Sequence, residues 1–324
     1  MRPARSLAEA LATRTVLLDG GLSNQLAAQG CDLNDALWSA RLLADDPGKI
    51  EAAHEAYVRA GAQVLITSSY QATYEGFADR GVSRREATTL LARSVELARR
   101  AGVGGGEGEG GPPEVVSQVH AHAHAQAQAD VWVAASIGPY GAFLADGSEY
   151  RGRYGLTVRE LERFHRPRVE TLVAAEPDVL ALETVPDADE AEALLRVVEG
   201  CGVPVWLSYS VEGVRTRAGQ PLEEAFALAA GLDQVIAVGV NCCTPADADH
   251  AVELAAAVTG KPVVVYPNSG ERWDARAGAW RGDATFDPSR VEAWQAAGAR
   301  LVGGCCRVGP TEIARLAEYV ARTA

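Results

Sequence analysis

Two pairs of adjacent cysteines are the residues of this sequence best suited to chemistry. The pairs Cys242-Cys243 and Cys305-Cys306 contain four of the six cysteines in the 324-residue chain. Thiolate sulfur is a soft ligand that suits zinc, with Zn–S distances of about 2.3 Å. The alternative interpretation is that these are small apolar side chains of the core, as free cysteines often are. The metal interpretation requires a fold that brings the two pairs together.

The charge of a thiolate site would decide its chemistry. Three thiolates leave Zn²⁺ with a net negative charge, so the metal is a poor electrophile for water, and hydrolytic zinc sites more often use histidines. An open position on such a metal suits a further thiol, because a coordinated thiol is deprotonated outright. A free thiol has a pKa of about 8.5 and is mostly protonated at neutral pH. The cysteines therefore predict alkyl transfer to a substrate sulfur.

Eight apolar runs rich in β-branched residues must position the cysteines. Segments with helical periodicity separate them, among them 46–62, 85–102 and 187–202. Strands that alternate with helices form parallel βαβ units, and nearly continuous apolar character fits strands buried on both faces. Eight repeats favour a closed (β/α)8 (TIM) barrel over an open sheet, since no GxGxxG follows the first run. The runs are 15–21, 62–69, 131–139, 177–185, 203–211, 235–243, 261–270 and 299–306.

Most of these runs end in polar residues. In (β/α)8 barrels the carboxyl ends of the strands and the following loops build the active site. The runs that end in the two cysteine pairs are separated by one strand, so the cysteines are expected to meet at one side of the mouth. Asp19 and Glu183 also follow apolar runs. An unpaired carboxylate would be costly in the core, whereas at the mouth it can face a ligand.

The composition is that of a soluble globular protein, with 48% hydrophobic and 23% charged residues. We predict one domain over residues 1–324, because such a barrel takes about 250 residues and more with insertions. A net charge of −13 argues against nucleic acid or an anionic membrane as a partner. Without an apolar membrane span or signal peptide, we expect a cytoplasmic protein with reduced thiols, in which Cys31 and Cys201 are structural. Nothing in the sequence indicates an oligomeric state.

Residues 102–129 depart from the barrel pattern. They are glycine-rich and then contain a His-Ala/Gln-Ala repeat with His120, His122 and His124. Low complexity of this kind is typical of a surface loop. The spacing could place three imidazoles on one side of an extended segment, but a functional site needs ligands held by rigid surroundings. We predict a surface loop and attach no function to it.

The segments GVNC and GGCCR, together with others spread along nearly the whole chain, resemble the homocysteine S-methyltransferases, most of all the bacterial and plant branch that uses S-methylmethionine or S-adenosylmethionine. The motifs GVNC and GGCCR resemble the zinc motifs of that family, which implies Cys242, Cys305 and Cys306 as Zn²⁺ ligands. The other segments that carry the resemblance are LLDGGLSNQLAAQGCDLNDALWSARLL, RAGAQVLITSSYQATYEGFADRG, SIGPYGAFLADGSEYRGRY, FHRPRVETL, LALETVPDADEAEAL, VVYPNSGE and QAAGARLVGGCCR.

The resemblance also implies how the substrate binds. Asp19 and Glu183 would hold the amino group of homocysteine, and Gly20 and Thr67 would lie at its carboxylate. Carboxylates suit an ammonium, and N–H and hydroxyl donors suit a carboxylate. The alternatives are a turn or capping role for Asp19 and a surface ion pair for Glu183. No side chain is expected to act as catalytic acid or base, because the nucleophile is the substrate thiolate.

Cys243 departs from the family pattern. Neighbouring residues in an extended chain point to opposite sides, so we predict that Cys243 faces away from the metal. Two alternatives remain open: Cys243 closes the zinc shell when no substrate is bound, or it is a permanent fourth ligand of a closed structural site.

These observations predict zinc-dependent transfer of a methyl group from a sulfonium donor to the thiol of L-homocysteine, which forms methionine. Positioning supplies most of the catalytic effect. Aromatic faces could hold the sulfonium by a cation–π attraction of about 0.5–2 kcal/mol. The alternatives are a selenocysteine acceptor, a betaine donor, a corrinoid partner (disfavoured because no extra domain is evident), and a non-catalytic barrel with a four-cysteine structural zinc or a metal-handling role. The aromatic candidates are Trp38, Tyr70, Tyr140 and Tyr266.

Overall fold

Eight parallel strands form the central sheet of the computed structural model, which describes residues 3–33, 37–104, 130–274 and 279–322. The strands are β1 (Val16–Leu17), β2 (Val64–Ile66), β3 (Trp132–Ile137), β4 (Val179–Val185), β5 (Val205–Tyr209), β8 (Val235–Asn241), β9 (Val263–Tyr266) and β12 (Ala299–Val302). Their order is β1-β12-β9-β8-β5-β4-β3-β2, and each neighbouring pair is parallel. Each strand lies within one of the eight predicted apolar runs.

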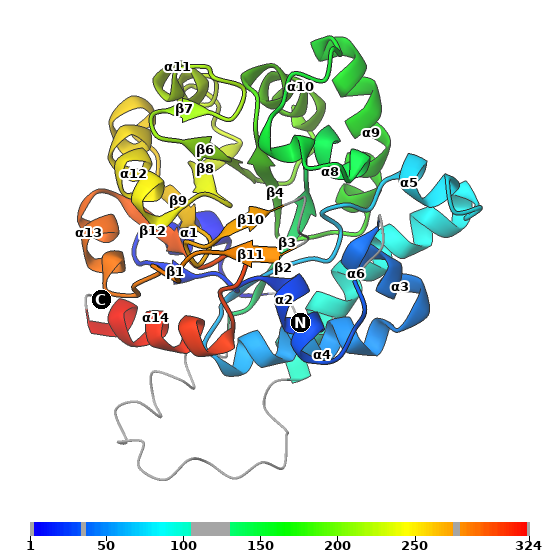
Figure 1. Ribbon diagram of the computed structural model, residues 1–324, viewed down its shortest axis with the longest axis horizontal. Helices are drawn as coiled ribbons and strands as arrows, with labels where there is room; N and C mark the ends of the chain where they lie inside the picture. Colours follow the sequence, from blue (N-terminus) through cyan, green and yellow to red (C-terminus); the bar gives the residue numbers. More distant parts are fainter. Residues whose placement is uncertain (1–2, 34–36, 105–129, 275–278, 323–324) are drawn as a thin grey trace, which may run out of the picture.

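The sheet closes on itself. Leu18 and Val64 form a parallel bridge, and the Asp19 N–H donates to the Val64 carbonyl at 3.0 Å. These contacts join the two end strands, β1 and β2, so the predicted (β/α)8 barrel is confirmed (Figure 1).

Helices surround the barrel (Figure 1). The predicted helical segments correspond to α4 (Pro47–Arg59), α6 (Arg84–Gly104) and α10 (Ala188–Val198). Since α6 runs to Gly104, the first residues of the predicted low-complexity loop are helical; the rest of it, with His120, His122 and His124, lies outside the described residues. The other α-helices are α1 (Leu7–Leu11), α2 (Leu22–Ala28), α3 (Leu42–Asp45), α5 (Tyr74–Ala78), α8 (Tyr140–Leu144), α9 (Val158–Ala174), α11 (Leu222–Ala227), α12 (Pro245–Thr259), α13 (Arg290–Ala296) and α14 (Pro310–Arg322).

Local sequence signals fix the helix ends near the mouth. Thr244 caps α12 by accepting from the Asp247 N–H at 3.2 Å, and Pro245 occupies the first turn, where a missing N–H costs nothing. The helix ends at Gly260, whose φ of 63° is left-handed. Thr244 and Pro245 therefore start α12 directly after Cys243.

Apolar side chains pack in two layers. The outer layer lies between the strands and the helices, and the inner layer fills the barrel around Trp132, Trp206 and Tyr266. Leu7 and Leu11 of α1 belong to the inner layer, and the Trp132 indole N–H donates to the Arg5 carbonyl at 3.0 Å. The N-terminal helix therefore closes the amino-terminal end of the barrel.

Some short elements were not predicted from the sequence. Two hairpins interrupt the barrel pattern, β6–β7 (Val211–Glu212 and Arg215–Thr216) and β10–β11 (Arg272–Asp274 and Ala279–Arg281). A 3₁₀ turn, η2 (Ser148–Tyr150), follows α8. No helix among the described residues is both long enough and apolar enough to cross a membrane.

Candidate metal centre and substrate cavity

Three cysteine sulfurs converge at the carboxyl ends of β8 and β12. The Sγ of Cys242 lies 3.1 Å from that of Cys305 and 3.6 Å from that of Cys306, and the latter two are 4.0 Å apart. Within the described part of the chain, these residues are the one group of three or more histidine, cysteine or carboxylate side chains compact enough to hold a metal ion.

The sulfur positions fit a tetrahedral metal. With Zn–S bonds of about 2.3 Å, the sulfurs at three corners of a tetrahedron are about 3.8 Å apart. The separations of 3.1, 3.6 and 4.0 Å bracket that value. Three soft donors on one side of an ion leave its fourth position for another ligand. The cluster is therefore a candidate metal site with one open position.

A left-handed turn places Cys242 in the cluster. Its φ is 52°, a conformation that costs a non-glycine residue about 1–2 kcal/mol. The preceding Asn241 is anchored to the end of β4: its Oδ1 accepts from the Thr184 N–H and its Nδ2 donates to the Thr184 hydroxyl, both at 2.7 Å. These bonds fix the end of β8 and hold the turn that directs the sulfur into the mouth.

Cys243 lies in a different environment. Its side chain is fully buried in the outer apolar layer, and burial raises the pKa of its thiol. It is not part of the sulfur cluster. The expected direction agrees with the structure, but the physical reason differs, because the left-handed turn at Cys242, and not the alternation of an extended strand, separates the two side chains.

Paired glycines let the loops after β1 and β12 touch. A Cβ on Gly20 would lie 2.3 Å from the Val308 carbonyl oxygen, and one on Gly304 would lie 2.1 Å from the Val308 side chain. The Gly21 N–H donates to the same carbonyl at 2.9 Å. The DGG and GGCC motifs therefore pack against each other, which holds Cys305 and its neighbour at the mouth.

The sulfurs form part of the wall of a cavity of about 120 Å³ at the mouth. Of the predicted substrate-binding residues, Gly20, Thr67 and Glu183 line it. Asp19 is fully buried beside it, and its Oδ2 accepts from the N–H of the lining residue Ile66 at 2.9 Å. The other lining residues are Gly21, Leu22, Ser23, Asn24, Ser39, Ser68, Tyr70, Gln71, Glu149, Tyr150, Thr184 and Gly304.

Asp19 and Glu183 are buried carboxylates at this cavity, and no cationic side chain of the described residues pairs with either. Glu183 is 6% exposed and accepts hydrogen bonds from the hydroxyls of Ser136 and, at 3.0 Å, Tyr266. Burial raises the pKa of Glu183 to about 7, and burial together with the charge of Glu183 raises the pKa of Asp19 well above its usual value. The Oδ1 atom of Asp19 has no hydrogen-bond partner. A cationic ligand would restore the charged form of both groups.

This geometry rules out the alternatives considered for the two carboxylates. Glu183 is too buried for a surface ion pair. Asp19 bonds to Ile66 on the neighbouring strand, and the N-cap position of α2 is Gly21, which makes no side-chain cap.

Thr67 is held by the protein itself. Its Oγ1 accepts from the Ser136 N–H at 3.0 Å and lies 2.7 Å from the Ser69 hydroxyl. Since the Ser69 hydroxyl donates to the Ser136 carbonyl, the proton of Thr67 points to Ser69. The neighbouring Ser68 hydroxyl, which sequence reasoning missed, has no partner among the residues that the structure describes. Of these hydroxyls, that of Ser68 is therefore the one left to meet a ligand.

Two further residues of the mouth were missed. Glu149 and Tyr150 lie on η2, and the Tyr150 hydroxyl is 3.4 Å from the Cys242 sulfur. Glu149 is 5% exposed, its Oε2 has no partner, and burial raises its pKa to about 7. The only sequence signal was their place within SIGPYGAFLADGSEYRGRY, since a short turn has no periodicity to reveal it.

Of the three aromatic candidates whose side chains the structure describes, Tyr70 lines the cavity and the other two do not. Tyr140 packs against Phe143 and Phe164, and Tyr266 is buried in the barrel with Trp206. Both are packing residues, so their interpretation as sulfonium-binding faces was wrong. The side chain of the fourth candidate, Trp38, lies outside the described part of the structure.

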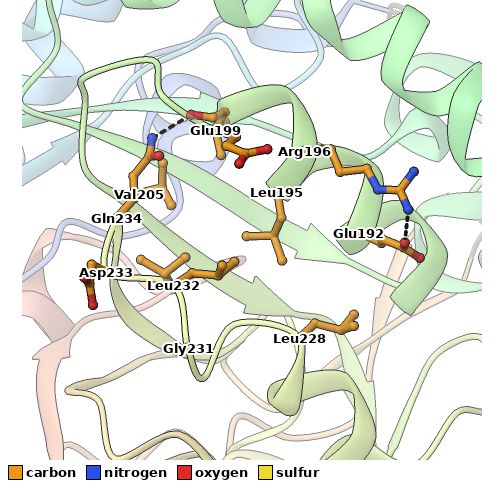
Figure 2. A pocket seen from close by; sticks show the side chains of 12 residues that line it. Glu192, Leu195, Arg196, Glu199, Val205, Leu228, Gly231, Leu232, Asp233 and Gln234 are labelled. Carbon is orange, nitrogen blue, oxygen red and sulfur yellow. Dashed lines mark hydrogen bonds and ion pairs between the residues drawn. The ribbon is translucent and has the colours of Figure 1, made fainter.

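A second hollow lies at the opposite end of the barrel (Figure 2). It is bounded by α10 and by the residues that precede β8, with Leu195, Leu228 and Leu232 on its apolar side and an Arg196–Glu192 ion pair at its edge. No cysteine or histidine lines it. The chemistry-bearing groups therefore gather at the mouth.

The fold and the site together are those of a (β/α)8-barrel protein with a three-cysteine candidate metal site beside a cavity. The profile of the family described as homocysteine S-methyltransferase matches residues 16–320. The chain belongs to this family and is an enzyme of its class.

Individual relatives agree. Homocysteine S-methyltransferase of Escherichia coli (strain K12) is 42% identical over 306 residues, which cover 93% of this chain and 94% of that protein. Homocysteine S-methyltransferase 4 of Zea mays is 43% identical over 320 residues, covering 94% of this chain and 89% of its own. The crystal structure of the homocysteine methyltransferase MmuM from Escherichia coli in its metallated form has a TM-score of 0.80 at 41% identity, covering 97% of this chain and 98% of that chain.

Proposed function

We propose that this enzyme transfers a methyl group from a sulfonium donor, S-methylmethionine or S-adenosylmethionine, to the thiol of L-homocysteine, and that it requires Zn²⁺ held by Cys242, Cys305 and Cys306. The observation that carries the proposal is the juxtaposition of three sulfurs within 4.0 Å of one another and a cavity bordered by the buried carboxylates of Asp19 and Glu183. Zn²⁺ would supply the acidification of a substrate thiol, which at neutral pH is otherwise mostly protonated.

The amino acid part of the substrate fits the rest of the mouth. Asp19 and Glu183 would accept hydrogen bonds from the ammonium group, which also relieves the cost of burying two carboxylates. The backbone at Gly20 and the Ser68 hydroxyl would face the carboxylate, while Thr67 shapes the wall through its bonds to Ser69 and Ser136. Each charged end of homocysteine thus meets groups of suitable chemistry.

The reaction itself asks little of protein acids or bases. The homocysteine sulfur forms a bond to the methyl carbon while the bond from that carbon to the donor sulfonium breaks. The electron pair of the broken bond stays on the donor sulfur, which leaves as a neutral thioether, and no proton needs to move in this step. Catalysis is then mainly alignment of the two sulfurs and the methyl group. The Tyr70 and Tyr150 rings lie at the cavity and could face the sulfonium charge.

The position of Cys243 disfavours the alternative of a structural zinc site with four cysteine ligands. A closed four-cysteine site needs a fourth sulfur, but Cys243 is buried in the outer apolar layer and not in the cluster. We further propose that the enzyme acts on small molecules in the cytoplasm, because three thiol ligands require a reducing compartment.

A donor panel tests the proposal. Purified protein is stripped with a chelator, reloaded with Zn²⁺, and incubated with homocysteine and S-methylmethionine, S-adenosylmethionine or betaine. We expect methionine from at least one sulfonium donor, loss of activity after stripping and recovery with Zn²⁺. Methionine from betaine alone would overturn the assignment of the donor class, and no methionine from any donor would overturn the methyl transfer.

A further inference from the structure

We propose that a buried cluster of His165, Arg168 and Glu190 positions the segment 138–154, and through it Glu149 and Tyr150, for methyl transfer. The inference rests on the proposed function for its kinetic consequence. None of the three residues lines the mouth cavity, so they would act as positioning residues.

The cluster joins two helices behind the barrel wall. His165 and Arg168 lie one turn apart on α9, Glu190 lies in the first turn of α10, and all three are at most 1% exposed. The His165 Nε2–H donates to Glu190 Oε1 at 2.9 Å, which leaves Nδ1 to accept from Arg168 Nη2 at 2.7 Å. The imidazole is therefore neutral, in agreement with burial and the Arg168 charge, which lower its pKa well below the usual value.

Arg168 and Glu190 also bind backbone of the loop after β3. Arg168 Nη2 donates to the Gly138 carbonyl, and Glu190 Oε1 accepts from the Tyr140 N–H at 2.6 Å. These are an acceptor and a donor two residues apart, at the point where β3 ends and α8 begins. The cluster thus fixes the direction in which the chain leaves the barrel.

Close packing carries this position to the mouth. A Cβ on Gly141 of α8 would lie 2.3 Å from the Glu149 backbone nitrogen, so α8 rests directly on η2. The Tyr150 hydroxyl then reaches the Cys242 sulfur at 3.4 Å, and Glu149 points an unpartnered oxygen into the same region. On the other side, a Cβ on Gly138 would lie 2.6 Å from the Tyr70 carbonyl oxygen. Displacing this loop would therefore move Tyr70, Glu149 and Tyr150 at the mouth.

Ionisable side chains are an expensive way to fill a core. Burying polar groups is costly, and well-packed apolar residues are often at least as stabilising. Hydrogen bonds to two specific backbone groups give a directional restraint that apolar packing cannot give. We therefore attribute these three residues to the positioning of the loop after β3 and not to the stability of the core.

The test compares Glu190→Leu, Glu190→Gln and a control, Asp178→Leu. Glutamine keeps an Oε1 acceptor for Tyr140 and His165, whereas leucine does not. Asp178 is the control because its Oδ2 accepts from the Val133 N–H at 2.7 Å and pairs with Arg99, at the opposite end of the same strand β3. A fourth variant, Gly141→Ala, displaces η2 from α8 while leaving the cluster intact, so it tests the packing step separately. If Glu190→Leu does not fold, Arg168→Met, which removes the bond to the Gly138 carbonyl, takes its place in the comparison.

Kinetic constants are measured per folded, zinc-loaded molecule of the full chain, with homocysteine varied against S-methylmethionine. Because a misplacement of about 1 Å can cost about 100-fold in rate, we expect Glu190→Leu and Gly141→Ala to lower kcat/KM by about 10- to 100-fold. Glu190→Gln and Asp178→Leu are expected to stay within about threefold of the wild type. Equal losses in Glu190→Leu and Asp178→Leu, or wild-type constants in Glu190→Leu, would overturn the positioning role.

Amide hydrogen exchange separates this inference from the proposed function. Glu190→Leu is expected to accelerate exchange in peptides that cover 138–154, and Asp178→Leu is not. If the wild type makes no methionine but the two variants show these exchange results, the proposed function is contradicted and the restraint is supported. Unchanged exchange in Glu190→Leu contradicts the restraint whatever the activity.

Discussion

The two ends of the barrel treat polar side chains differently. At the amino-terminal end, which α1 closes, the buried Gln63 and the half-buried Asp178 and Gln234 all find protein partners. Gln63 accepts from the Arg14 guanidinium at 2.8 Å, and Asp178 accepts from the Val133 N–H at 2.7 Å. The amide of Gln234 donates to two carbonyls before β5, at 2.7 and 3.0 Å.

At the mouth, several buried polar atoms lack partners, beside others, such as those of Thr67 and Glu183, that the fold itself binds. Asp19 Oδ1, the Ser68 hydroxyl and Glu149 Oε2 accept and donate no hydrogen bond within the described structure. An unsatisfied buried polar group costs about 1–3 kcal/mol, so several of them at one place indicate a ligand that satisfies them. The comparison indicates that polar residues at the amino-terminal end stabilise the fold, whereas the unpartnered ones at the mouth are available to bind a ligand.

Loss of a sulfur from the cluster is expected to have the largest effect. Since second-shell changes alone cost metal sites about 10- to 100-fold, Cys305→Ser is predicted to lower activity by more than about 100-fold while the barrel stays folded. Activity and circular dichroism melting check this, with Cys201→Ser, a cysteine outside the mouth, as control. Unfolding of Cys305→Ser would indicate a structural site instead.

Neutralising a mouth carboxylate is expected to weaken substrate binding without weakening the fold. A hydrogen bond to a charged group contributes about 1.5–3 kcal/mol, so Glu183→Gln is predicted to raise the KM for homocysteine by about 10- to 150-fold at pH 8. Steady-state kinetics and a melting curve check it. At the other end, Gln63→Leu is expected to lower the melting temperature and leave KM unchanged, and the reverse pattern would break the comparison.

Ser68→Ala is predicted to have a smaller effect. One neutral hydrogen bond contributes about 0.5–1.5 kcal/mol, so KM for homocysteine rises by about 2- to 12-fold, while the unfolding free energy does not fall because the hydroxyl has no partner to lose. Thr67→Val, which breaks the bonds to Ser69 and Ser136, is expected to destabilise the protein measurably. Equal destabilisation by both variants would show that Ser68 is held by the fold.

His54 of α4 sharpens the comparison, because it is a buried group that does not line the mouth cavity. Among the described residues neither ring nitrogen has a partner, and burial lowers its pKa to about 4. The unfolded state, with a pKa of about 6.5, then binds the proton first, so the wild type loses up to about 3 kcal/mol of stability from this group as pH falls from 6.5 to 4. His54→Leu is predicted to flatten that loss in urea unfolding and to leave kcat and KM unchanged. A catalytic defect would contradict the assignment of function to the mouth alone.

The sequence predicted the barrel because its strands are continuous apolar runs, each found where expected. The sequence also predicted that the cysteine pairs meet at one side of the mouth, since the order of the strands follows from eight βαβ repeats. It could not reveal the left-handed turn at Cys242, which depends on Asn241 reaching across to Thr184 on another strand. Glu149 and Tyr150 were missed because a short turn has no periodicity and only tertiary packing brings it to the sulfurs.

The most direct test of the account asks which cysteine of the first pair holds the metal. Zinc content and zinc affinity are measured for Cys242→Ser and Cys243→Ser by metal analysis and competition with a chromophoric chelator. The account predicts that Cys243→Ser binds one Zn²⁺ per chain with wild-type affinity and that Cys242→Ser binds it at least about 100-fold more weakly. Wild-type affinity in Cys242→Ser, or an equal loss in Cys243→Ser, would contradict it.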